Sequence, residues 1–290
     1  MRFLHLSDLH FHGDASDNTE IMATLAMIKA NYPEHYLIIT GDIVEHGTEA
    51  QYEQAQAALM PFNEKKQRVF IVPGNHDFGT KGFLYSQEKA RRFDEMLAIP
   101  LKQGGTFKGD NIPVVNIVKD TTDTVMLIGL DSNLETDTPV DIACGEIGEG
   151  QRKALDTILS MKTPPNMRKI LFFHHHLLYL HITLDRIKNS ITSVFSDPTD
   201  ILRGIEDLFA NGAMKLKDAD ELIKIISNRV DVVLFGHKHV SGMWPDAAKG
   251  NEQQAGIPYV LASDNTPGKD KAREIDVTNG VVTVREVPIK

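Results

Sequence analysis

Short apolar runs alternate with segments of helical periodicity along the first part of the chain. The runs at 2–8, 35–42 and 68–77 have the length of buried strands, and each one ends in polar residues. Between them, residues 17–31 place apolar side chains three and four positions apart, and residues 48–66 form a second helical segment. Strands separated by helices of this length predict right-handed crossovers and a largely parallel sheet.

Both predicted helices begin with residues that stabilise a helix amino terminus. Asp17 and Glu20 have the spacing of a capping box, and Thr48 and Gln51 repeat it. We therefore expect each helix to begin close to these residues.

The rest of the chain is less regular but still rich in strand patterns. A helix is predicted at 150–161, and Asn279-Gly280 between two apolar runs is a strong signal for a β-hairpin. The predicted strands lie at 112–118, 124–132, 170–176, 230–239, 257–263, 273–278 and 280–287.

No repeat, low-complexity tract or linker divides the chain, so we expect a single domain over residues 1–290. The segment 178–228 is a helical insertion with two helix patterns, at 199–211 and 218–227. We expect this segment to form a cap beside the functional site or a contact in a homodimer. Five apolar residues motivate that expectation: Ile182, Ile187, Ile191, Val194 and Phe195.

Composition narrows the class of protein. The 290 residues are 41% hydrophobic and carry a net charge of -9, which argues against broad binding to nucleic acid. The single cysteine, Cys144, excludes an internal disulfide and fits a reducing compartment. The chain shows neither a signal peptide nor an apolar run long enough for a membrane span, so we expect a cytoplasmic protein without membrane contact.

Residues that could bind a ligand or a metal ion lie where the predicted strands end. In an open α/β fold the carboxyl ends of strands form the ligand site, so these residues should converge. Carboxylates, an amide and imidazoles suit Mn, Fe or Zn better than Ca. They are too many for one ion, which favours a two-metal centre with Asp42 able to bridge. The five clusters are Asp8-Leu9-His10, Gly41-Asp42, Gly74-Asn75-His76-Asp77, His174-His175-His176 and Gly236-His237-Lys238-His239.

The spacing within the clusters has a physical interpretation. Asp8 and His10 are two positions apart, so on an extended segment both side chains point to one face, and His237 and His239 repeat this arrangement. The glycines before these residues would allow sharp turns and close approach to an ion.

Each cluster also has an ordinary structural interpretation. Gly-Asp is common turn chemistry, Asp77 would serve as a capping residue, and the three histidines would be buried and hydrogen-bonded. Agreement at five strand ends favours the metal site over these separate explanations.

The ordered clusters resemble the calcineurin-like metallophosphoesterase superfamily, from Arg2 to about Val240, and are most similar to its bacterial class III cyclic-nucleotide phosphodiesterases. The resemblance implies an α/β fold in which two mixed β-sheets pack as a sandwich flanked by helices, in four αββα layers. It also implies two divalent or mixed-valence metal ions, such as Mn, Fe or Zn.

The resemblance further assigns roles to residues. His76 would be catalytic, facing the phosphate, and Asn75, His76 and His175 would contact the substrate. Leu177 stands where the family carries proline, so His174 and His175 both remain candidates for one metal ligand, with His174 favoured because it leaves the strand first. The implied metal ligands are Asp8, His10, Asp42, Asn75, His174, His237 and His239.

The activity implied by the resemblance is hydrolysis of a phosphate ester by in-line attack of a metal-bridging hydroxide. A phosphodiesterase acting on small substrates, such as cyclic nucleotides or glycerophosphodiesters, is the leading hypothesis. The alternatives are a phosphomonoesterase, a DNA nuclease and a non-catalytic scaffold of the same fold.

Four residues near the clusters have open roles. We expect His5 to be packed within the first strand, and His12 and His46 to be candidates for substrate contact. Asp131 ends the strand at 124–132, where it would either support a metal ligand or cap a turn.

Overall fold

The computed structural model describes residues 1–80, 84–108, 112–135, 145–178, 216–245 and 256–290. Its helices are α1 Thr19–Asn31, α2 Glu49–Leu59, α3 Asn75–Phe78, α4 Gln87–Phe93, α6 Gly148–Ser160 and α9 Ala219–Ile226, with the short turns η1 Ala15–Asn18, η2 Met60–Phe62 and η3 Asp94–Ala98. Its strands are β1 Arg2–Leu6, β2 Tyr36–Thr40, β3 Val69–Val72, β4 Gly79–Thr80, β5 Leu84–Tyr85, β6 Val114–Lys119, β7 Thr124–Gly129, β8 Met167–Phe172, β9 Val232–Phe235, β10 Gly242–Trp244, β11 Tyr259–Ala262, β12 Lys271–Thr278 and β13 Val281–Pro288.

The first sheet has the strand order β13-β12-β1-β2-β3. Strands β1, β2 and β3 are parallel, joined by the crossovers that contain α1 and α2, whereas β12 is antiparallel to β1 and places Asp276 opposite Arg2. The predicted hairpin between β12 and β13 is confirmed. Asn279 and Gly280 have φ angles of 51° and 70°, as a two-residue turn of type I′ requires.

The second sheet has the order β10-β11-β9-β8-β7-β6. Its inner strands are parallel, and β6 and β10 pair antiparallel at its two edges. The parallel pairing expected for the first three strands is therefore confirmed, and the two mixed sheets that the family resemblance implied are both present. Periodicity identifies a strand but does not specify its neighbours, so it could not separate the two sheets.

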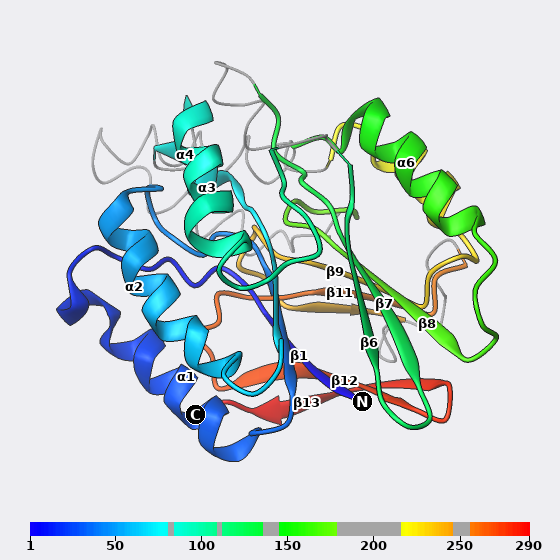
Figure 1. Ribbon diagram of the computed structural model, residues 1–290, viewed down its shortest axis with the longest axis horizontal. Coiled ribbons are helices and arrows are strands. Elements are labelled where there is room, and N and C mark those ends of the chain that lie inside the picture. The colour runs from blue at the N-terminus through cyan, green and yellow to red at the C-terminus, as the bar shows by residue number, and fades with distance from the viewer. Residues whose placement is uncertain (81–83, 109–111, 136–144, 179–215, 246–255) are drawn as a thin grey trace, which may run out of the picture.

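The four layers follow from alternating side chains. In β9, Val232 and Leu234 belong to the core between the two sheets, whereas Val233 and Phe235 belong to the core under α6 and α9. Figure 1 shows α1 and α2 on the outer side of the first sheet and α6 beside the second. Two mixed β-sheets with flanking helices thus form the predicted αββα sandwich.

The two predicted helix starts have different outcomes. The capping box of Thr48 and Gln51 is present at the start of α2. The box at Asp17 and Glu20 is wrong, because α1 begins at Thr19 and Asn18 precedes it without a side-chain cap. Asp14 caps the preceding turn η1 instead. Within the described residues, the carboxylate of Asp17 makes no hydrogen bond.

Only the end of the predicted insertion at 178–228 lies within the described residues. There α9 confirms the helix expected at 218–227. The helix expected at 199–211, the five apolar residues of the proposed cap, and Cys144 all lie outside them, so the cap, the homodimer contact and the single domain stay predictions. None of the described helices is long and apolar enough to cross a membrane.

Candidate metal centre

Three ends of parallel strands in the first sheet supply the first half of the site. Asp8 and His10 follow β1, Asp42 follows β2, and Asn75 and His76 follow β3. Parallel pairing brings these ends to one edge of the sheet. Asp8, Asp42 and Asn75 are buried there.

The second sheet supplies the other half. His174 follows β8, and His237 and His239 follow β9, its parallel neighbour. The predicted residues therefore converge from the edges of two sheets rather than from one. His174 is fully buried, whereas the side chain of His239 is 45% exposed, so the site opens to solvent on the His239 side.

The donor atoms of these residues lie very close together. Nε2 of His239 is 3.2 Å from Asp8 Oδ1 and 3.2 Å from His10 Nε2. Around His174, Nε2 lies 3.0 Å from the Asn75 amide oxygen. Neighbouring ligands that bind one ion at about 2.1 Å are themselves about 3 Å apart, so this spacing fits shared cations.

His174 continues the same pattern toward Asp42 and His237. Its Nε2 lies 3.2 Å from Asp42 Oδ2 and 3.1 Å from His237 Nδ1. Three groups of candidate metal ligands result, each with its donor atoms within 4.8 Å of one another. The groups are Asp8, His10 and His239; His10, Asp42 and His76; and Asp42, His174 and His237.

The three consecutive histidines have different surroundings. His174 belongs to a candidate ligand group, and its Nδ1 donates to the Thr40 carbonyl at 2.7 Å. Nδ1 of His175 is 2.8 Å from Ser132 Oγ, and its ring lies 4.6 Å from that of His237. His176 packs against Phe235. The structure thus brings His174 into the cluster and places His175 beside it.

The backbone at the candidate ligands is left-handed rather than extended. Asp8 and His10 both have φ of 53°, and Asp42, His237 and His239 have φ of 49°, 77° and 48°. The prediction that Asp8 and His10 share a face of an extended segment is wrong. Tight left-handed turns direct these side chains inward, and such turns are uncommon for residues other than glycine.

Two of the predicted glycines are required by space. A methyl group at Gly236 would lie 1.8 Å from Ser7 Oγ, and one at Gly74 would lie 2.2 Å from Asp42 Oδ1. Any side chain there would displace the strand ends that carry the ligands. Close approach at both positions is to other protein atoms, and the predicted approach to an ion stays a prediction.

Two acidic residues position this cluster from outside it. Glu45, which the sequence reasoning missed, places Oε2 2.6 Å from His10 Nδ1, and its carbonyl accepts from His76 Nδ1 at 2.9 Å. Only its place three residues after Asp42 could have drawn attention to it. Asp77 accepts from the backbone N–H groups of Val44 and Gly74, which confirms its interpretation as a capping residue.

Charge in the cluster is balanced by imidazoles. Burial by itself would raise the pKa of Asp42, but nearby histidines, His174 first, hold it well below its ordinary value. Burial would lower the pKa of His174, yet Asp42 and Asp8 raise it to about 9. Burial and neighbouring imidazoles hold the pKa of His237 well below 6.5. His237 is thus neutral, the form that ligates metals.

A cavity of about 430 Å³ begins at His10 and His239, and we call it the side cavity. One wall comes from the segment before α1 and its first turn, and the other from the loop between β11 and β12. Besides the two histidines, the lining residues are Leu9, His12, Asp17, Asn18, Glu20, Ile21, Asp264, Asn265, Pro267, Gly268 and Lys269.

The remaining candidate residues mostly make contacts that stabilise the fold. His5 is fully buried in β1, as expected, with Nε2 3.0 Å from Thr40 Oγ1. Asp131 caps a turn by accepting from Asn133 and also pairs with Lys108 at 3.0 Å. Among the described residues, His46 lines no part of the side cavity, whereas His12 does.

The chain matches the family described as calcineurin-like phosphoesterase over residues 1–241. No curated protein sequence matches it. Among solved structures, a purple acid phosphatase from yellow lupin (Lupinus luteus) is 10% identical to this chain with a TM-score of 0.61. The match covers 100% of this chain and 51% of the phosphatase, so this chain spans about half the length of that protein.

Two further structures share the fold. A dimetal phosphatase from Danio rerio is 12% identical with a TM-score of 0.60, and the match covers 100% of this chain and 99% of that one. GAP50, the anchor in the inner membrane complex of Plasmodium, is 13% identical with a TM-score of 0.51, with coverage of 100% and 89%.

Proposed function

The chain belongs to the calcineurin-like phosphoesterase family, and we propose that it hydrolyses phosphate esters with two metal ions held between the edges of its sheets. One observation carries this proposal. Asp42 lies in two of the three candidate ligand groups, once with His10 and once with His174. A carboxylate shared in this way is suited to bridge two ions.

The donor set supports one assignment of ligands. One ion would be held by Asp8, His10, Asp42 and His239, and the other by Asp42, Asn75, His174 and His237. Carboxylate and amide oxygens combined with imidazole nitrogens suit Mn, Fe or Zn. When bound, such ions supply an acidified water and positive charge for the phosphate oxygens.

His76 is proposed to be catalytic rather than a ligand, although it lies within ligand distance of His10 and Asp42. Its Nδ1–H donates to the Glu45 carbonyl, which leaves Nε2 facing away from that contact. A His76 that carries a second proton would donate from Nε2 to the phosphate as negative charge develops there. Asn75 and His175 are proposed substrate contacts beside it.

A small phosphodiester is the proposed substrate class, as the resemblance to class III cyclic-nucleotide phosphodiesterases suggested. The side cavity next to the site has Asp17, Glu20 and Asp264 in its lining and Lys269 as its single lysine. Glu20 and Asp264 pair with lysines, so among the described lining residues Asp17 is the acid without an ion pair. Its negative charge favours a diester monoanion over a monoester dianion. The net charge of -9 weighs against DNA as the substrate.

The experiment compares three esters on protein loaded with manganese: bis(p-nitrophenyl) phosphate, p-nitrophenyl phosphate and cyclic AMP. We expect about two metal ions per chain by mass spectrometry and faster cleavage of the diesters. A faster monoester would instead make the protein a phosphomonoesterase. Protein that binds no metal and cleaves none of the three would be a scaffold with this fold.

The choice of histidine ligand has its own test. His174→Ala should lose metal and activity together, whereas His175→Ala should keep both metal ions and lose activity only in part. His175→Ala is the matched control, because it removes an equally buried imidazole one position away. Loss of metal from His175→Ala alone would reverse the assignment.

A further inference from the structure

The side cavity is continuous with the proposed metal site, because His10 and His239 belong to both. A phosphodiester bound at the metals has two organic arms, and one of them must leave as an alcohol. The open side of the site, at the half-exposed His239, faces this cavity. The side cavity therefore offers room beside the metal site for a leaving alcohol to extend.

The far wall of the cavity is fixed to the metal site by Thr266. Its N–H donates to the Ser7 carbonyl at 3.1 Å, and its hydroxyl accepts from the Ser7 N–H at 2.9 Å. Ser7 directly precedes Asp8, and Thr266 is 3% exposed. These two hydrogen bonds tie the loop to the residue that directly precedes the first candidate ligand.

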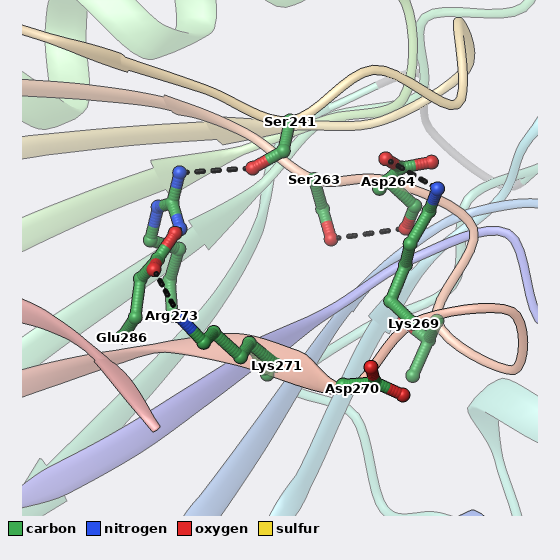
Figure 2. Close-up of a pocket in the computed structure, with 10 residues that line it drawn as sticks. Ser241, Ser263, Asp264, Lys269, Asp270, Lys271, Arg273 and Glu286 are labelled. Atoms are coloured by element: carbon green, nitrogen blue, oxygen red, sulfur yellow. Dashed lines mark hydrogen bonds and ion pairs between the residues drawn. The ribbon is translucent and has the colours of Figure 1, made fainter. Parts of the chain in front are cut away.

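The same loop separates the side cavity from a second one of about 280 Å³, shown in Figure 2. Asp264 and Lys269 line both cavities and pair at 3.2 Å across the loop. In Figure 2 the ammonium of Lys269 points at the Asp264 carboxylate. This pair neutralises one carboxylate of the wall and leaves Lys269 with further N–H donors.

Most other polar groups of the lining are also engaged. The Asn18 amide bonds the backbone at His12, and Glu20 pairs with Lys290 at 2.7 Å. Two side chains differ, because within the described residues neither the Asp17 carboxylate nor the His12 ring makes a hydrogen bond. Both belong to the wall formed by the segment before α1, whereas Lys269 belongs to the loop between β11 and β12.

We propose that the side cavity binds a leaving alcohol that carries hydroxyl groups, such as glycerol or a sugar, and that Asp17 accepts hydrogen bonds from those hydroxyls. A carboxylate accepts two hydroxyls at once, and an imidazole and an ammonium complete a set suited to a polyol. Hydrolysis breaks the bond from phosphorus to the alcohol oxygen, water supplies the new oxygen, and one of its protons passes to the alcohol. This proposal rests on the proposed function.

The test compares glycerophosphoglycerol, whose leaving alcohol has hydroxyls, with bis(p-nitrophenyl) phosphate, whose leaving group has none beyond the reacting oxygen. Asp17→Ala should lower kcat/KM for the polyol ester about tenfold, the scale of a hydrogen bond to a charged group. The aryl ester should change less than about twofold. Glu53→Ala removes an exposed carboxylate on α2 and should change neither rate.

The outcomes separate the two proposals. Equal losses on both esters, an unchanged rate on the polyol ester, or wild-type protein that cleaves only the aryl ester would each overturn the polyol site and leave the phosphoesterase intact. Wild-type protein that cleaves neither ester with manganese would contradict the proposed function itself.

Discussion

Buried acidic side chains have different kinds of partner at the two ends of the sandwich. At the amino ends of the strands, each buried acid has strong partners: Glu274 accepts from His35 at 2.8 Å and from Arg285 at 2.6 Å. Asp123, just before β7, accepts from two backbone N–H groups of the hairpin at Asn279 and Gly280. At the carboxyl ends, the partners that the structure shows for Asp8 and Asp42 are imidazoles and backbone N–H groups.

The acids at the amino ends of the strands therefore stabilise the fold, whereas those at the carboxyl ends form the candidate metal site. Acids paired with cations or with the backbone stabilise a fold, whereas Asp8 and Asp42 are two buried carboxylates close enough to repel each other, and a cation between them would relieve that repulsion. Left-handed backbone conformations at five of the seven candidate metal ligands also cost free energy of folding. We therefore expect changes at one end to affect chemistry and changes at the other to affect unfolding.

The largest effect should come from Asp42→Asn. Loss of the shared carboxylate should lower activity more than about 100-fold, beyond the cost of removing a group that only orients a ligand. Metal content should fall from two ions to one or none. The urea midpoint of the metal-free protein should fall only slightly, because the neutral amide no longer pairs with His174 but also no longer repels Asp8; a large fall would show that Asp42 also stabilises the fold.

Glu45→Gln should have the next largest effect. The variant keeps the shape of the side chain but weakens the orientation of His10, so metal affinity or activity should fall about 10- to 100-fold. Thermal unfolding without metal should barely change. Glu88→Gln, which alters an exposed pair with Arg92, is the control, and a fall of equal size there would contradict a specific role for Glu45.

Glu274→Gln tests the opposite end. The buried acid loses its charged contacts with His35 and Arg285, so the free energy of unfolding should fall by roughly 2 kcal/mol while activity stays unchanged. Glu286→Gln changes a half-exposed acid and should cost less than about 1 kcal/mol. If Glu274→Gln changed kcat without changing the free energy of unfolding, the proposed division of function and stability between the two ends would be contradicted.

The last effect depends on pH and concerns His5. Burial, with Arg273 nearby, lowers the pKa of His5 to about 3, whereas the unfolded chain takes up this proton near pH 6.5. The contribution of neutral His5 to the free energy of unfolding is therefore fully present above pH 6.5. It declines by up to about 1.4 kcal/mol per pH unit as the pH falls toward 3. His5→Gln should flatten this part of the dependence, measured by urea unfolding between pH 7 and 5.

The sequence predicted the strand ends, the hairpin at Asn279-Gly280 and the order of the candidate ligands, because each depends on local pattern. The hydrophobic pattern alone could not separate the two sheets, since strand pairing is a long-range property; only the family resemblance implied them. Nor did the sequence predict the left-handed turns at Asp8 and His10, because most residues other than glycine are extended or helical and the pattern indicated an extended segment. Glu45 was missed because it orients a candidate ligand through space and belongs to no strand-end cluster.

The placement of β12 beside β1 has a consequence for synthesis. During translation, the strand that covers the open edge of β1 emerges about 270 residues after β1, which is the separation of Phe3 from Ile275. Until then β1 presents unpaired N–H and C=O groups to solvent or to a chaperone. A nascent chain that stalls near residue 241, where the family match ends, would hold every candidate metal ligand and still expose that edge.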